Sequence, residues 1–342
     1  MIRRLILIAA LAGSLLAPNP AAAQSQPLSA ALAWLRTQQQ ADGGFSNGFV
    51  PGSDPGATAD AVLAITSAGE DAAQWTAGGQ SPLDALMAAV EGGAVTGAGG
   101  FAKVALAVQA AGLDVRSFGG VDLTASILAD YNAAAGLFGG GPYDTALAIQ
   151  ALRASGAALP DGVIAGLLAT RLPDGAYAFN GDRTPGAGDS NTTAMVVLAL
   201  VTAGETDAAT SSLEYFRSAQ NGDGGWTYQK PSAFGEATDA NSTALVMQAL
   251  AAAGEDLAAW NDPASALLSL QQPSGAFVFN AATPGDNLLA TVQAIPALAL
   301  SGDGSAPRGA SSVPLLGFIG LGLVLAAVLA AAALRRRSAR QA

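Results

Sequence analysis

The feature that most constrains the fold is an internal repeat, which returns six times between residues 24 and 302. One element reads Gln-x-x-x-Gly-x-aromatic and occurs at 39–45, 220–226 and 271–277. Weaker copies without the glutamine occur at 95–101, 132–138 and 171–177. Recurrence at a spacing of 20–50 residues is the signature of an array built from one supersecondary unit. The Gly-aromatic element is therefore predicted to be the turn of each unit.

A second element follows each turn and is apolar on nearly every face. Its six copies begin at Thr58, Val104, Thr145, Thr193, Thr243 and Leu288, and none of these eight-residue segments contains Phe, Tyr or Trp. A helix that is hydrophobic all round is a buried helix. The segments before the turns mix apolar and polar residues and are predicted to be outer helices, at 28–40, 82–91, 121–132, 161–172, 211–220 and 263–272.

Six helical hairpins cannot each bury an apolar inner helix alone, but a closed ring of six inner helices inside six outer ones buries them all. The sequence therefore predicts an all-α fold, the (α/α)6 toroid, over residues 24–302. An open solenoid is the alternative, and it would expose apolar surface at both of its ends.

The two ends of the chain have the composition of targeting segments. Arg3 and Arg4 precede an apolar run and then Ala21–Ala23, the pattern of a signal peptide over residues 1–23. Residues 313–334 carry no charge and are followed by a basic tail at 335–342, which predicts one transmembrane helix with its C-terminus in the cytoplasm. Residues 303–312 are predicted to be a tether. The expected location is the cell membrane, single-pass, with the toroid extracellular or periplasmic.

Composition narrows the chemistry. The chain has no Cys and no His, which excludes disulfides, thiol nucleophiles, a histidine base and zinc sites that use either residue. Residues 24–302 hold eight basic and 25 acidic residues, and such an acidic domain repels nucleic acid. No nucleic-acid partner is therefore expected.

Candidate site residues gather in the loops between turn and inner helix, several of which are long. Repeat proteins commonly place lengthened loops on the binding face. The candidate ligand-binding residues are Asp54, Tyr143, Asp144, Asp189, Asn191, Thr192, Tyr228, Asp239, Asn241 and Ser242. The alternative is that the Asp, Asn, Ser and Thr side chains only cap helices. Calcium ligation by Asp42, Asn221 and Asp223 is a weaker alternative, because no twelve-residue calcium loop is present.

The Gly-aromatic turns and the Thr-Ala inner segments together resemble the prenyltransferase/squalene-cyclase repeat superfamily, whose fold is the α/α toroid. Residues 287–298 look most like the closing repeat of the intrinsic factor/transcobalamin branch, and this resemblance implies cobalamin as a possible ligand. The class II cyclase motif D-x-D-D-T-A lies at the same place in that superfamily. Asp189 and Asp239 match its first acid, whereas Asn191 and Asn241 replace the central acid that would donate the proton.

The leading prediction is therefore an exported, membrane-anchored toroid that binds a large hydrophobic or corrinoid-like small molecule without catalysis, with no catalytic residue assigned. The absence of aromatic residues from the inner segments also speaks against carbocation chemistry, which aromatic faces stabilise. Two alternatives remain: a cyclase- or prenyltransferase-like enzyme with a degenerate acid motif, and a surface protein-interaction domain. An apolar chamber with a buried carboxyl of raised pKa would favour the enzyme.

Overall fold

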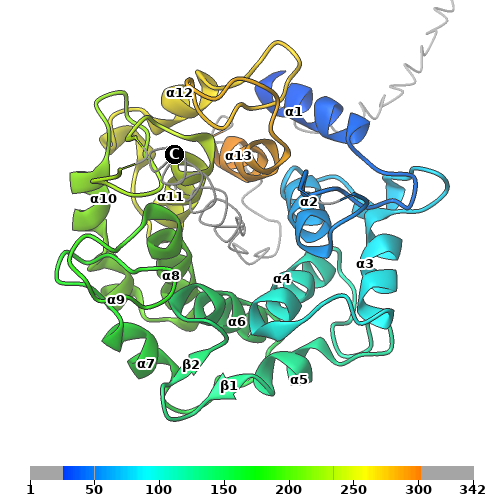
Figure 1. Ribbon diagram of the computed structural model, residues 1–342, viewed down its shortest axis with the longest axis horizontal. Coiled ribbons are helices and arrows are strands. Elements are labelled where there is room, and N and C mark those ends of the chain that lie inside the picture. Colours follow the sequence, from blue (N-terminus) through cyan, green and yellow to red (C-terminus); the bar gives the residue numbers. More distant parts are fainter. Residues whose placement is uncertain (1–25, 50, 234, 302–342) are drawn as a thin grey trace, which may run out of the picture.

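The computed structural model describes residues 26–49, 51–233 and 235–301, and it forms one closed ring of helical hairpins (Figure 1). Six helices surround the centre: α2 (Pro55–Ser67), α4 (Gly97–Ala110), α6 (Pro142–Ala154), α8 (Ser190–Ala203), α11 (Ala240–Ala252) and α13 (Leu288–Ser301). Each packs against the next, and α13 packs against α2, which closes the ring. The predicted closed toroid is confirmed, and the open solenoid is wrong.

Shorter helices cover the outside of the ring. These are α1 (Gln26–Thr37), α3 (Pro82–Glu91), α5 (Leu123–Leu128), α7 (Val163–Ala169), α10 (Leu213–Ala219) and α12 (Pro263–Leu268). The connections add η1 (Ala72–Gln74), α9 (Thr206–Thr210) and η2 (Leu257–Ala259). The inner helices are almost fully buried because their Ala, Val, Leu and Ile side chains contact both neighbouring inner helices and the outer layer.

The Gln-x-x-x-Gly-x-aromatic turns join neighbouring repeats. The side-chain Nε2 of Gln39 donates to the carbonyl of Gly43 at 2.9 Å and to that of Trp75, in the next repeat, at 2.9 Å. Gln220 does the same with Gly224 and Trp260, at 2.7 and 2.6 Å. Each glutamine thus holds its own turn and the following repeat together.

The last of these glutamines closes the ring. Gln271 Nε2 donates to Gly275 O at 3.0 Å and to Pro27 O at 2.8 Å, so the sixth repeat is bonded to the start of the first. Gly275 has φ +94°, and a Cβ placed on it would lie 2.2 Å from the carbonyl oxygen of Ala30. Glycine is needed here because the two chain segments meet backbone to backbone.

A threonine near the start of an inner helix holds the preceding turn in place through its hydroxyl group. The hydroxyls of Thr58, Thr145, Thr193, Thr243 and Thr291 accept bonds of 2.9–3.0 Å from the backbone N–H of the buried turn aromatics Phe45, Phe138, Tyr177, Trp226 and Phe277. The sixth copy of the repeat therefore aligns on Thr291, three residues after the Leu288 at which it was predicted to align, although α13 itself does begin at Leu288.

The second and third repeats depart from the predicted boundaries. Residues 97–101 open α4 and form no turn, because the carboxylate of Asp130 accepts from Ala98 N at 2.9 Å and caps that helix from the next repeat. The predicted outer helix 121–132 ends at Leu128. There Tyr131–Asn132 (β1) pairs antiparallel with Leu137–Phe138 (β2), and Asn132 Oδ1 accepts from Ala134 N at 3.1 Å to form the turn between them.

Helix α6 also begins earlier than predicted and includes Tyr143, and α4 includes Phe101. The expectation that the inner helices lack aromatic residues is therefore wrong for these two helices. Across the described part of the chain, no helix is long and apolar enough to cross a membrane. The predicted signal peptide, tether, transmembrane helix and tail all lie outside the described residues.

The turn geometry gives a stability prediction. Gly224 has φ +94°, and an added Cβ would lie 2.0 Å from Asn261 O, whereas a Cβ on the neighbouring Gly222 would meet nothing within 4 Å. Gly224→Ala should lower the free energy of unfolding by about 2 kcal/mol or more, and Gly222→Ala by less than about 0.5 kcal/mol. Chemical denaturation of the two variants measures the difference. Equal losses would show that the close approach at Gly224 is not real.

Candidate functional site

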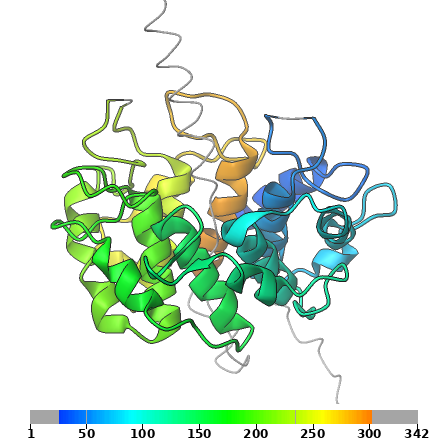
Figure 2. The same cartoon turned by 60° about the horizontal axis from the view of Figure 1, so that its bottom comes forward.

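A cavity of about 550 Å³ lies where four inner helices present their N-terminal turns. Its walls come from the first turns of α2, α8, α11 and α13, from α1, and from the loops that precede α2 and α13. These loops stand on the same end of the ring (Figure 2). The cavity is therefore on the side where the sequence places its candidate residues.

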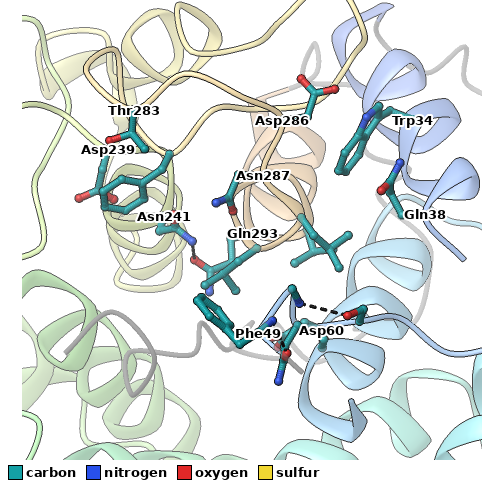
Figure 3. Close-up of a pocket in the computed structure, with 18 of the residues that line it drawn as sticks. Trp34, Gln38, Phe49, Asp60, Asp239, Asn241, Thr283, Asp286, Asn287 and Gln293 are labelled. Carbon is teal, nitrogen blue, oxygen red and sulfur yellow. Dashed lines mark hydrogen bonds between the residues drawn. The ribbon is translucent and has the colours of Figure 1, made fainter. Parts of the chain in front are cut away.

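Asn241 on α11 and Gln293 on α13 form a polar pair in the cavity wall (Figure 3). Asn241 Nδ2 donates to Gln293 Oε1 at 2.7 Å. The remaining atoms, Asn241 Oδ1 and Gln293 Nε2, have no hydrogen-bond partner, although the residues are only 4% and 2% exposed. A buried polar atom without a partner costs about 1–3 kcal/mol, so these two atoms are available to a ligand.

Asp60 on α2 belongs to the same wall and forms an ion pair with Lys103 on α4. Lys103 Nζ lies 3.0 Å from Asp60 Oδ2, and both side chains are buried. Asp60 Oδ1 has no partner. Burial raises the pKa of Asp60 to about 6, and the nearby Lys103 ammonium opposes that rise. The pair therefore leaves one buried carboxylate oxygen of this cavity-lining residue without a partner.

The remainder of the wall is largely apolar. Trp34 of α1, Phe49 and Phe279 of the covering loops, and Leu288, Leu289 and Val292 at the start of α13 line it. Phe49 is 62% exposed. A mostly apolar cavity with a few convergent polar groups is the usual form of a small-molecule site.

Three of the predicted acids are helix N-caps. Asp54 Oδ1 accepts from Ala57 N at 2.8 Å, Asp189 Oδ1 from Thr192 N at 2.7 Å, and Asp239 Oδ1 from Ser242 N at 2.7 Å. The capping alternative thus describes what these side chains do. Asp239 also lines the cavity, and its second oxygen accepts from the Ser242 hydroxyl at 2.9 Å.

The two deepest caps sit in an environment that disfavours charge. Burial raises the pKa of Asp189 and of Asp239 to about 7 in each case, although the bonds from Thr192 and Ser242 favour the carboxylate. Each oxygen of Asp239 accepts one hydrogen bond from Ser242, so the carboxyl is held in the first turn of α11.

The structure separates the predicted residues into two groups. Asn191, Asp239, Asn241 and Ser242 line the cavity. Outside its lining are Asp54, Tyr143, Asp144, Asp189, Thr192 and Tyr228. Sequence reasoning thus identified part of the wall and several of its immediate supports.

The residues outside the lining have other surroundings. Tyr143 packs on Phe179 with ring centroids 5.3 Å apart, and burial raises its pKa well above the ordinary value. Burial likewise raises the pKa of Asp144, whose Oδ2 accepts from Gly140 N at 2.7 Å. The pKa of Tyr228 is raised by burial and by the charge of Asp189.

Sequence reasoning missed Asp60, Lys103 and Gln293. A signal was present, because Asp60 is the one charged residue inside the six predicted inner segments and Lys103 directly precedes the second of them. Asp60 follows Thr58 by two positions and Gln293 follows Thr291 by two, so both occupy the same place in the repeat once the sixth copy is aligned correctly. Within the described residues, no group of three acidic side chains is placed to hold a metal ion.

Comparisons with solved structures show the fold. A protein from Actinoplanes superposes with TM-score 0.60 at 17% identity, covering 80% of this chain and 97% of that one. The type II terpene cyclase MstE from Scytonema gives 0.57 at 15%, covering 80% and 96%. An unsaturated glucuronyl hydrolase specific for heparin gives 0.56 at 12%, covering 80% and 95%. The chain has the α/α-toroid fold that these structures share.

These likenesses extend to the fold alone, and the transcobalamin branch is not among the superposed structures named above. A variant of the Scytonema cyclase has been solved in complex with geranylgeranyl dihydroxybenzoate, its substrate. No family model and no curated protein matches the chain.

The buried ion pair gives a prediction with a defined pH dependence. The folded-state pKa of Asp60, about 6, lies above its ordinary value of 3.8, so the stability that this group contributes is present below about pH 4 and is lost as the pH rises through 6. Lys103→Met removes the cation that opposes this rise. It should therefore cost about 3–5 kcal/mol at pH 8 and clearly less at pH 5, where Asp60 takes up a proton.

Denaturant unfolding at the two pH values measures this effect. Lys230→Met is the matched control, since Lys230 contacts Asn221 Oδ1 at 3.0 Å and Gln220 O at 3.4 Å and should give a small, pH-independent loss. The double variant Asp60→Leu, Lys103→Met should recover much of the stability, because no buried charge remains. An equal loss for Lys103→Met at both pH values would contradict this account of the pair.

Proposed function

We propose that the protein binds one amphipathic small molecule in the cavity at the N-terminal ends of α2, α8, α11 and α13. The apolar body packs against Trp34, Phe49, Phe279 and the leucines of α13, and a polar end reaches the pair Asn241–Gln293 and Asp60. The observation that carries this proposal is the set of buried polar atoms without partners in an otherwise apolar wall. Four of the buried unpartnered atoms belong to residues of this one wall, and a ligand with matching groups would supply the hydrogen bonds that they lack.

The volume agrees with a ligand of ordinary size. Small-molecule cavities span about 300–1,000 Å³, and this one is about 550 Å³. A substrate like that of the Scytonema cyclase, with an apolar chain and a polar head, has the required chemistry. Cobalamin remains a proposal from the resemblance of residues 287–298, as does the surface location, which depends on the terminal segments.

A second candidate is an enzyme that uses a cavity carboxyl as an acid or base. It is favoured by the raised pKa values of Asp60 and Asp239, about 6 and about 7, at the wall of an apolar cavity. The interactions of these two carboxyl groups argue against the enzyme, since Asp239 accepts a hydrogen bond from Ser242 and Asp60 forms an ion pair with Lys103. Protonation of an alkene also needs a strong acid, and a group with a pKa near 7 is a weak one. Binding without catalysis is therefore the better-supported function.

Binding can be tested on the full chain by thermal shift and by the fluorescence of Trp34. This is the tryptophan that lines the cavity, whereas Trp75, Trp226 and Trp260 are buried. Prenylated aromatic acids, sterol-like molecules, polyprenyl compounds, alkylamines and corrinoids form the ligand panel. A ligand of the right class at 100 times its Kd should add about 2.7 kcal/mol of stability and change a signal that disappears in Trp34→Phe.

The double variant Asn241→Leu, Gln293→Met separates binding from folding. It removes both partners of the polar pair, so stability should be unchanged or slightly higher, while ligand affinity falls at least tenfold. Gln150→Met is the control. Gln150 is also buried with an unpartnered Oε1, but it lies outside the cavity, and its replacement should leave affinity unchanged. Failure of every class in the panel, or full affinity in the double variant, would refute the proposal.

A further inference from the structure

The unpartnered atoms of the cavity are mostly acceptors. Asp60 Oδ1, Asn191 Oδ1 and Asn241 Oδ1 can only accept a hydrogen bond, and the one donor is Gln293 Nε2. Asn191 is 6% exposed, so all four residues are buried. These acceptors come from three different inner helices, α2, α8 and α11, around the same cavity. The polar end that satisfies them must therefore carry several N–H or O–H groups.

The formal charge of the cavity wall also favours a ligand whose polar end donates hydrogen bonds, because the wall is acidic. Asp60, Asp239 and Asp286 line the cavity, and within the described residues no Lys or Arg does. Lys103 on α4 contacts Asp60 Oδ2, whereas the oxygen without a partner is Oδ1. Lys103 is not part of the cavity lining. An anionic ligand would meet carboxylates without a cation to offset them.

Helix N-termini often bind anions, and four of them meet here. Their first turns are already occupied, however, by side chains of this chain. Asp54, Asp189 and Asp239 cap α2, α8 and α11, and Asn287 Oδ1 accepts from Ala290 N at 2.9 Å on α13. Three of the four caps are carboxyl groups, which further disfavours an incoming anion.

Aromatic rings complete the environment. Trp34, Phe49 and Phe279 line the cavity together with these acceptors. Aromatic faces attract organic cations as well as apolar groups, and the attraction grows when the cation is removed from water.

Resting on the proposed function, we infer that the polar end of the ligand is a primary ammonium group, attached to a compact apolar body. The three ammonium hydrogens bond to Asp60 Oδ1 and to the amide oxygens of Asn191 and Asn241. Asp60 then has a cation at each oxygen, Lys103 at one and the ligand at the other. Gln293 keeps Asn241 oriented through its 2.7 Å bond.

Two matched ligand series test the charge of the polar end on the full chain, with Trp34 fluorescence as the readout. The first series is 1-aminoadamantane, 1-adamantanol and adamantane-1-carboxylate, and the second is hexylamine, hexanol and hexanoate. At pH 7.5 the amine of each series should bind at least tenfold more tightly than the alcohol, and the carboxylate most weakly. Asp60→Asn should remove most of the preference for the amine, so that the amine and the alcohol of each series bind with similar affinity.

Glu91→Gln makes the same change of charge at an exposed position on α3 and should leave the selectivity as in the wild type. If Asp60→Asn fails to fold, Asn191→Leu serves instead and should weaken amine binding several-fold. An alcohol or carboxylate that binds as tightly as the amine, with affinity still dependent on Asn241 and Gln293, would overturn this inference and leave the proposed function standing. If no member of either series binds, the ammonium inference falls, and the broader ligand panel decides the proposed function.

Discussion

The structure depends on one repeated hydrogen bond, between the threonine hydroxyl at the start of an inner helix and the backbone N–H of the turn aromatic. It occurs in five of the repeats with nearly the same length, from 2.9 Å at Phe45 to 3.0 Å at Trp226. Because it fixes where each inner helix starts relative to its turn, it brings the N-terminal turns to the same end of the ring. The cavity exists where those turns meet, so its position follows from this bond.

The ring architecture could be predicted because its signals are local and repeated. Gln39, Gln220 and Gln271 each act within a few residues of the turn that they identify, and the apolar inner segments indicate burial directly. The predicted helix boundaries are wrong where a residue from another repeat determines the position at which a helix begins. Helix α4 begins at Gly97 with the help of Asp130, which accepts from Ala98 N and lies 32 residues after Ala98, and no pattern near Gly97 shows this contact.

The site was harder to predict than the fold for the same reason. Asn241 and Asp239 were identified from the loop that they end, but the residues that complete the wall beside them lie elsewhere in the chain. Gln293 meets Asn241 across 52 residues, and Asp60 joins the same wall because α13 packs against α2. The shared place of Asp60 and Gln293, two residues after threonine, was hidden by the register error at Leu288. Knowing that the ring closes was therefore not enough to show which side chains face its centre.

In the proposed ligand cavity, the side chains that cap the helices determine which polar groups are left to bind a ligand. Were the helix ends uncapped, four sets of free N–H groups would make the cavity a site for anions. Asp54, Asp189, Asp239 and Asn287 satisfy these groups from within the chain. The polar atoms left over are chiefly oxygens, one of them on the carboxylate that Lys103 does not reach. Asp189 and Asp239, which the sequence analysis places at the first acid of a cyclase-like motif, therefore act as caps that satisfy these competing donors.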